Sequence, residues 1–94
     1  MTEIKIPKTK REAYAQLEEM LSDEDKSAIM NGDPIQFHFS LGMWIRNNWI
    51  YGQEEEDVKR LAKAFRTEML FFEADSLSEK IIEYYQRYLK RKGL

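Results

Sequence analysis

Three polar side chains interrupt the otherwise apolar faces of the stretch from Asp33 to Gly52, and they are His38, Arg46 and Asn48. A histidine can transfer protons near neutral pH and an arginine can clamp an anion, so the two could act together on an anionic substrate. His38, however, is the single histidine and the chain has no cysteine, which excludes a two-imidazole metal site, a thiolate metal site and a thiol nucleophile. No serine–acid arrangement accompanies it either. We therefore expect no catalytic residue, no metal and no cofactor, and we favour for His38 a core position with a hydrogen bond to a backbone carbonyl.

Arg46 is the more informative of these residues because a guanidinium stays charged in a protein. If it lies in a buried helix, as the surrounding apolar residues indicate, it must pair with a carboxylate or bond to backbone carbonyls, because an unpaired buried charge is strongly destabilising. Asp75 is the first candidate partner and Asp33 the second. We favour an ion pair that fixes the fold over the binding of an anionic ligand.

The element that positions these residues is predicted to be a buried helix over about residues 34–48. Asp33 can act as the N-cap, Pro34 suits the first helical position, and Gln36 completes a capping box. The apolar residues of this helix spread over more than half of its circumference, which is typical of a helix surrounded by others. Gly42 within it costs roughly 1 kcal/mol relative to alanine, so a neighbouring backbone or ring is expected to approach closely there.

The remaining chain predicts an all-α fold, a compact bundle of four to five helices around that central helix. Residues 1–8 are expected to form an N-terminal arm and residues 9–94 a single helical domain. Capping or acidic residues indicate further helix starts at Thr9, Ser22, the Gln53–Asp57 run and Asp75–Ser76. The short apolar run over residues 69–72 is interpreted as a connector packed into the core, with an exposed partner-binding lip as the alternative.

The C-terminal helix combines cations with aromatic residues. The cations are Arg87, Lys90, Arg91 and Lys92, and the tyrosines are Tyr84, Tyr85 and Tyr88. Such a combination can bind nucleic acid through phosphate contacts and base stacking. In helical projection, however, the tyrosines fall on the apolar face and the cations on the other. Core tyrosines, together with cations that favour the negative end of the helix dipole, explain the same residues and are the favoured interpretation.

The sequence from Phe37 to Trp49, FHFSLGMWIRNNW, resembles the signature H-F-x-L-G-x-W-I-R-N-N-W of an uncharacterised family of small bacterial domains. That family continues with an acidic turn and a helix ending in a Tyr-Arg-Tyr-Leu-like stretch, and residues 75–78 and 86–89 stand at those places. The family usually has Gly-Leu-Trp after the second tryptophan, where this chain has Ile50-Tyr51-Gly52. The resemblance implies a bacterial protein without an assigned activity, so it supplies no catalytic residues. Candidate structural or recognition residues are therefore His38, Trp44, Arg46, Asn47, Asn48, Trp49 and Asp75.

Composition limits the class of function. The chain has 94 residues, a net charge of −2 and 34% charged residues, which is typical of a solvated surface of mixed sign. It has no signal-peptide-like N-terminus and no apolar run near the roughly 20 residues of a membrane span, so we expect a cytoplasmic protein without membrane contact. A non-enzymatic protein-interaction or regulatory module with a protein partner is the first hypothesis. Nucleic-acid binding through Arg87, Lys90, Arg91 and Lys92 is the alternative, and an enzyme with His38 and Arg46 in one open pocket comes third.

Overall fold

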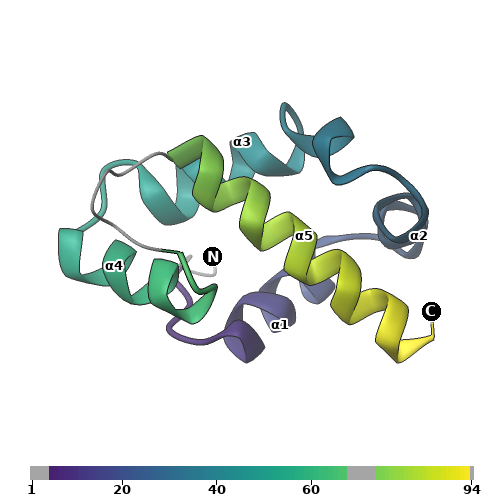
Figure 1. Cartoon of the computed structure of the whole chain (residues 1–94), viewed down its shortest axis with the longest axis horizontal. Coiled ribbons are helices and arrows are strands. Elements are labelled where there is room, and N and C mark those ends of the chain that lie inside the picture. Colours follow the sequence, from purple (N-terminus) through teal and green to yellow (C-terminus); the bar gives the residue numbers. More distant parts are fainter. Residues whose placement is uncertain (1–4, 68–73, 94) are drawn as a thin grey trace.

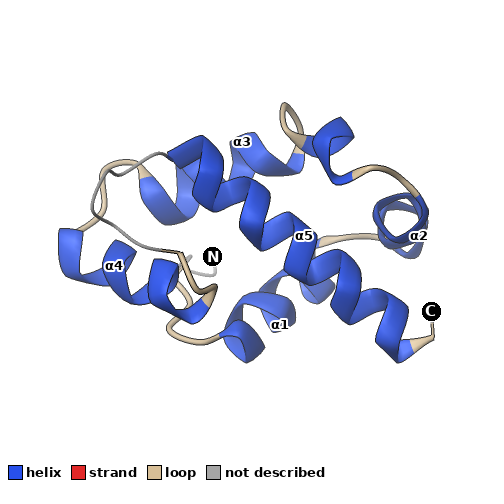
Figure 2. Cartoon of the chain, in the orientation of Figure 1, coloured by secondary structure: helices blue, strands red, loops and turns tan. Residues whose placement is uncertain are grey.

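Helices make up the regular structure of this chain (Figure 2). The computed structural model describes residues 5–67 and 74–93, which form five α-helices, one 3₁₀ turn, one π-helical turn and no strand. In chain order the elements are α1 (Lys10–Met20), α2 (Asp23–Asn31), η1 (Pro34–Phe37), α3 (Leu41–Ile45), η2 (Arg46–Ile50), α4 (Glu55–Ala64) and α5 (Ala74–Lys92). The prediction of an all-α bundle is confirmed.

The longest helix, α5, is the element on which the others pack. It runs diagonally across the molecule, with α3 and α4 toward its N-terminal end and α1 and α2 toward its C-terminal end (Figure 1). Contacts join it to α2, η1, α3 and η2. Its apolar residues recur three or four positions apart, so they share one face and are buried: Leu77, Ile81, Ile82, Tyr85 and Leu89.

Local capping explains where several helices begin. The Thr9 hydroxyl accepts a hydrogen bond from the Glu12 amide at 3.1 Å, and α1 follows it. The Ser22 hydroxyl caps α2 in the same way through the Asp25 amide, also at 3.1 Å. The capping box expected at Asp33 is present, but it opens a 3₁₀ turn. The last helix, α5, begins at Ala74, two residues before the start expected from Ser76.

The expected single helix over residues 34–48 is divided in the structure, which corrects that prediction. The chain forms η1, a turn through residues 38–40, then α3, and it ends in the wider turn η2, where the Tyr51 amide donates to the Arg46 carbonyl at 2.7 Å. Ser40 has φ −101° and ψ −87°, outside the helical region. The segment is also less enclosed than expected, since Phe39 is 79% exposed. Only its second half, from Leu41 onward, is largely buried.

Tertiary contacts explain this division better than local propensity does. The turn leaves the His38 carbonyl oxygen to accept a hydrogen bond from the Arg46 side chain. The wider η2 turn lets Arg46, Trp49 and Ile50 all face the interior. These contacts connect residues that a local pattern does not show to be neighbours.

Parts of two predicted segments lie outside the described residues. They are residues 1–4 of the expected N-terminal arm and the apolar run at residues 69–72. The rest of the arm, residues 5–8, has no helix; Pro7 is buried and the Lys5 carbonyl accepts a hydrogen bond from Gln16 at 2.7 Å. The arm is thereby joined to α1.

Candidate functional site

The Arg46 guanidinium lies at the junction of η2 and α5, and each of its nitrogens has an oxygen nearby. Nη1 donates to the Ser78 hydroxyl at 3.0 Å and Nη2 donates to the His38 carbonyl at 3.1 Å. Nε lies 3.4 Å from Oδ1 of Asp75. Arg46 is only 6% exposed, so these contacts compensate for a charge that water barely reaches.

Two features of the fold accommodate this buried arginine: oxygen atoms on α5 that contact it, and a glycine that leaves space beside it. Asp75 and Ser78 are three residues apart and share one face of the first turns of α5, where the Ser78 hydroxyl also donates to the Asp75 carbonyl at 2.9 Å. On the other side, a Cβ atom at Gly42 would lie 3.0 Å from Nη1 of Arg46 and 3.3 Å from the Phe37 carbonyl oxygen. A side chain at position 42 would therefore be crowded by the guanidinium and by a carbonyl, which favours glycine there. Ser78 was not identified from the sequence.

Asp33, the second candidate partner for Arg46, has a different role. Its carboxylate accepts a hydrogen bond from the Ile35 amide at 3.1 Å and caps η1. A short polar residue before Pro34 is the usual arrangement for such a cap, so the sequence motif accounts for Asp33 without Arg46.

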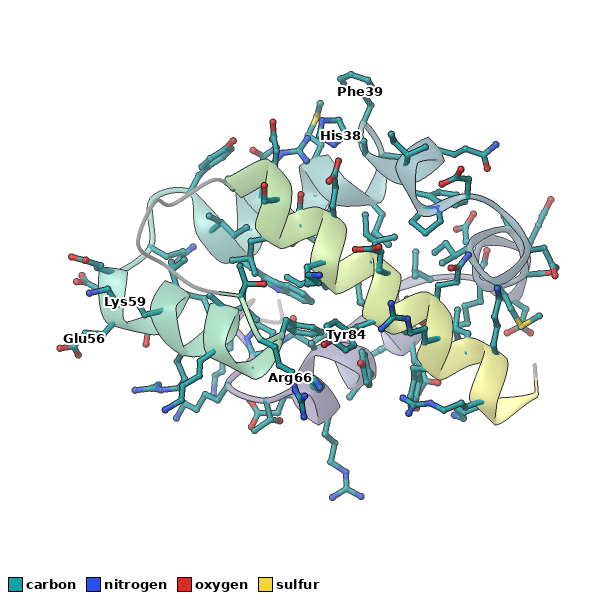
Figure 3. The ribbon with its side chains drawn as sticks, in the orientation of Figure 1. His38, Phe39, Glu56, Lys59, Arg66 and Tyr84 are labelled. Carbon is teal, nitrogen blue, oxygen red and sulfur yellow. The ribbon has the colours of Figure 1, made fainter. Side chains whose placement is uncertain are left out.

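His38 lies at an outer edge of the molecule, beside Phe39 (Figure 3). Its ring is partly buried, and Nδ1 lies 3.6 Å from Oε1 of Glu79, too far for a hydrogen bond. No described residue is hydrogen-bonded to Nδ1. Arg46 contacts the His38 backbone rather than the ring, and neither residue lines either of the two cavities described below.

The two tryptophans of the signature differ in exposure. Trp49 is fully buried, and its indole donates to the Gln16 side chain of α1 at 3.2 Å. Trp44 is partly exposed and contacts Trp49 edge-on, with ring centroids 5.4 Å apart. Asn48 donates from its side chain to the Trp44 carbonyl at 2.8 Å, which satisfies a backbone acceptor near the wider η2 turn, whereas Asn47 is exposed.

An apolar groove lies where α1, α2, η1 and α3 meet, and its volume is about 400 Å³. Several residues of the Phe37–Trp49 segment line this groove, among them Trp44. The residues lining it are Met20, Leu21, Asp25, Ala28, Ile29, Phe37, Ser40, Leu41 and Trp44.

Gln86 of α5 fixes the position of α2, the helix that forms one wall of this groove. The sequence analysis did not identify Gln86. Its buried amide donates to the Ile29 carbonyl at 2.9 Å and to the Gly32 carbonyl at 2.6 Å, at the C-terminal end of α2. These carbonyls have no partner further along the helix, so a side-chain donor satisfies them. A signal was available, because Gln86 is a polar residue on the apolar face of α5, between Ile82 and Leu89.

A second cavity, of about 460 Å³, lies between α1 and the C-terminal half of α5, and we call it the basic pocket. It is lined by Lys10, Tyr14, Tyr84, Arg87, Lys90 and Arg91. The structure thus brings three of the four predicted cations together, while the fourth, Lys92, pairs with Glu18 at 2.9 Å. Tyr84 also departs from the expected separation of tyrosines and cations, since the Lys10 ammonium and the Arg87 guanidinium lie 4.4 and 5.3 Å from its ring centroid. Lys10, 74 positions before Tyr84, could not be placed there from local spacing.

The described residues lack two further features that would point to a function. No group of three or more histidine, aspartate or glutamate side chains there is placed to hold a metal ion. Among the same residues, no helix has both the length and the apolar character that crossing a membrane requires.

The fold and these sites define a small helical domain built on α5. It has one buried arginine that is surrounded by oxygen atoms, together with the two surface cavities described above. The chain matches the model of the family described as a domain of unknown function (DUF6794) over residues 6–89, and it belongs to that family. The resemblance to an uncharacterised family of small domains is thereby confirmed. No curated protein and no solved structure matches the chain.

Proposed function

We propose that this domain is a non-enzymatic protein-interaction module whose apolar groove receives an amphipathic helix from a partner protein. The observation that carries the proposal is the groove itself, a recess of about 400 Å³ with mainly apolar walls. A helix that inserts one apolar face into a hydrophobic groove is a common mode of peptide recognition.

The walls of the groove suit such an occupant. Met20 is 40% exposed although it is a large apolar side chain, and a flexible thioether can adapt to different apolar surfaces. Trp44 adds a partly exposed aromatic wall, and aromatic residues with methionine are enriched at protein interfaces. Nearby in the sequence, η1 and the turn after it expose Ile35 and Phe39. Neither of these two residues lines the groove itself.

The charge around the groove specifies the partner further. Asp25 lines it, and the exposed residue Glu24 precedes it in the first turn of α2, whereas Asp23 in the same turn is paired with Lys26 at 4.0 Å. Glu19, beside Met20 on α1, is exposed as well. An acidic edge favours a partner helix with lysine or arginine flanking its apolar face, because complementary charge steers association.

The two hypotheses from other classes have less support. An enzyme acting through His38 and Arg46 needs both side chains in one pocket, whereas each nitrogen of the guanidinium already has a protein oxygen within 3.4 Å. Extended nucleic acid needs cations along a track, whereas Lys92 is paired with Glu18, and Arg87, Lys90 and Arg91 converge on one cavity.

Site-specific photo-cross-linking in the native host tests the proposed groove. A photoreactive residue in place of Met20 is expected to give an adduct with a partner peptide that is amphipathic and basic. The same residue in place of Tyr51, which is 50% exposed and does not line the groove, is the control. Equal adducts from both positions, or an adduct only with a second copy of this chain or with a small molecule, would contradict the proposal.

Affinity measurements with the purified partner then locate the binding surface. Ala28 and Ala15 are both exposed alanines on helices, but only Ala28 lines the groove. Ala28→Arg places bulk and positive charge in the groove and should weaken binding by at least about tenfold, a hot-spot effect. Ala15→Arg has the same change in charge and volume and should stay within about twofold. Equal affinities of the two variants would place the partner elsewhere.

A further inference from the structure

The basic pocket concentrates positive charge on the other side of α5 from His38 (Figure 3). Its cations are Lys10 from α1 and Arg87, Lys90 and Arg91 from α5. None of these four forms an ion pair with a carboxylate of residues 5–67 or 74–93, whereas several cations elsewhere do. Like charges held close together repel unless something compensates them, so the pocket favours an anion.

Tyr84 arranges these cations around its ring. The Lys10 ammonium lies 4.4 Å and the Arg87 guanidinium 5.3 Å from the ring centroid, both within cation–π range. In Figure 3, Tyr84 lies on the far side of α5 from His38 and Phe39. The ring thereby holds together a lysine and an arginine from two helices without neutralising their charges.

The second feature of the pocket is the Tyr14 hydroxyl, a buried polar group on a residue of its wall. Tyr14 lines the pocket and is only 7% exposed, yet no described residue is hydrogen-bonded to its hydroxyl. Buried hydroxyl groups almost always have a hydrogen-bond partner. Burial raises the pKa of the Tyr14 hydroxyl, while the charge of Arg91 and, more weakly, that of Arg87 act to lower it.

The size and charge of the pocket select the class of anion. A volume of about 460 Å³ exceeds what a single inorganic phosphate needs and falls in the range of small-molecule sites. Two guanidinium groups can each bind phosphate oxygens in a bidentate way, and four cations exceed the charge of one carboxylate. The net charge of the chain, −2, disfavours an extended polyanion beyond the pocket.

We propose that the basic pocket is a binding site for a small phosphorylated ligand with the size and charge of a nucleoside diphosphate or triphosphate. Arg87, Lys90, Arg91 and Lys10 bind its phosphate oxygens, and the Tyr14 hydroxyl donates to one of them.

An amide NMR titration of the full chain tests this site, with pyrophosphate, ADP and a single-stranded DNA 12-mer as probes. Pyrophosphate or ADP should shift the resonances of the residues lining the pocket. Lys90→Gln with Arg91→Gln should weaken that binding by at least about tenfold. Lys63→Gln with Lys80→Gln removes the same charge at exposed positions outside the pocket and should change the affinity by less than about twofold.

Two results would overturn the proposal. One is the absence of pocket shifts with both phosphate probes at about 5 mM. The other is tighter binding of the DNA than of either probe, with an affinity that grows with DNA length, which would identify a polynucleotide surface.

Tyr14→Phe separates a ligand contact from a structural role. Removing an unpartnered hydroxyl should leave the melting temperature of the free chain unchanged or raised, and yet weaken phosphate binding several-fold. Tyr85→Phe is the matched control, since Tyr85 also has a buried hydroxyl without a described partner but does not line the pocket. Equal phosphate affinities of the two variants would remove Tyr14 from the site.

Discussion

At the N-terminal end of α5, each nitrogen of the Arg46 guanidinium has a protein oxygen within 3.4 Å. At its C-terminal end, the four cations of the basic pocket have no ion pair with a described carboxylate, and Tyr14 buries a hydroxyl without a described partner. Both ends place positive charge against the same helix. The first end satisfies that charge from within the chain, and the second leaves it to interact with something else.

This difference between the Arg46 site and the basic pocket indicates two roles for polar residues in one small protein, stabilising the fold and binding a ligand. A buried charge with its own partners specifies how elements pack, because any other arrangement would leave it unpaired. Polar groups left unpartnered near the surface lower the stability of the free protein and can be satisfied by a ligand. We therefore expect substitutions at the Arg46 end to alter stability, and those at the basic pocket to alter binding.

The largest effect should come from Arg46→Met. The variant removes the donor to Ser78 and to the His38 carbonyl, and it leaves Asp75 without its cation. Because the Asp75 side chain is itself well exposed, we expect a loss of about 2 kcal/mol, below that for a fully buried pair. The melting temperature should fall by roughly 10 °C, measured by circular dichroism.

Arg60→Met is the control for that measurement. Arg60 forms an ion pair with Asp57 at 3.6 Å on the exposed side of α4, so its loss should change stability by less than about 0.5 kcal/mol. Similar melting temperatures for the two variants would mean that the contacts of Arg46 do not stabilise the fold.

The next largest effect is expected from Gly42→Ala. It tests the surroundings of Arg46 at α3. Alanine normally stabilises a helix interior by roughly 1 kcal/mol relative to glycine. Here its Cβ would lie 3.0 Å from Nη1 of Arg46, so we expect a net loss of about 1–2 kcal/mol instead.

A double-mutant cycle in urea identifies the cause of that loss. Arg46→Met removes the group that the new methyl would meet, although the Phe37 carbonyl stays 3.3 Å away. In that background Gly42→Ala should be at least about 1 kcal/mol less destabilising. Additive losses would show that the guanidinium does not determine the need for glycine.

The capping motifs at Thr9, Ser22 and Asp33 predicted local structure well because each depends on residues two or three positions apart. The break after η1 was not predictable in this way. It depends on the contact between Arg46 and the His38 carbonyl, and the arginine is held in turn by Ser78, 32 positions later.

The candidate sites show the same limit. Periodicity placed Arg87, Lys90 and Arg91 on one helix and separated them from the tyrosines. The pocket also needs Lys10, which packing brings from α1 to the ring of Tyr84. Helical projection describes one helix at a time, so it shows which residues share a face and not which other helix completes a cavity.

A smaller difference in stability is expected between variants that remove one hydroxyl group each, Ser78 at the Arg46 site and Tyr14 at the basic pocket. Ser78→Ala removes an acceptor from Nη1 of Arg46 and should cost about 1 kcal/mol. Tyr14→Phe removes a hydroxyl without a described partner and should change stability by less than about 0.5 kcal/mol. Both values come from chemical denaturation without ligand. If Tyr14→Phe is the more destabilising of the two, the contrast between the two ends is wrong.

The smallest effect concerns Lys92, the cation near the C-terminal end of α5 that is paired with Glu18. The hydrogen bond from Lys92 lowers the pKa of Glu18 below its ordinary value of 4.5, against a smaller opposing effect of burial. A lowered folded-state pKa means that the stabilisation is fully present above pH 4.5 and is lost as the pH falls through the lowered value. Glu18→Gln should therefore reduce the melting temperature by about 1–2 °C at pH 7, as expected for an exposed ion pair, and leave it unchanged at about pH 2. A deficit that stays constant between these pH values would show that packing, and not the ion pair with Lys92, accounts for the contribution of Glu18.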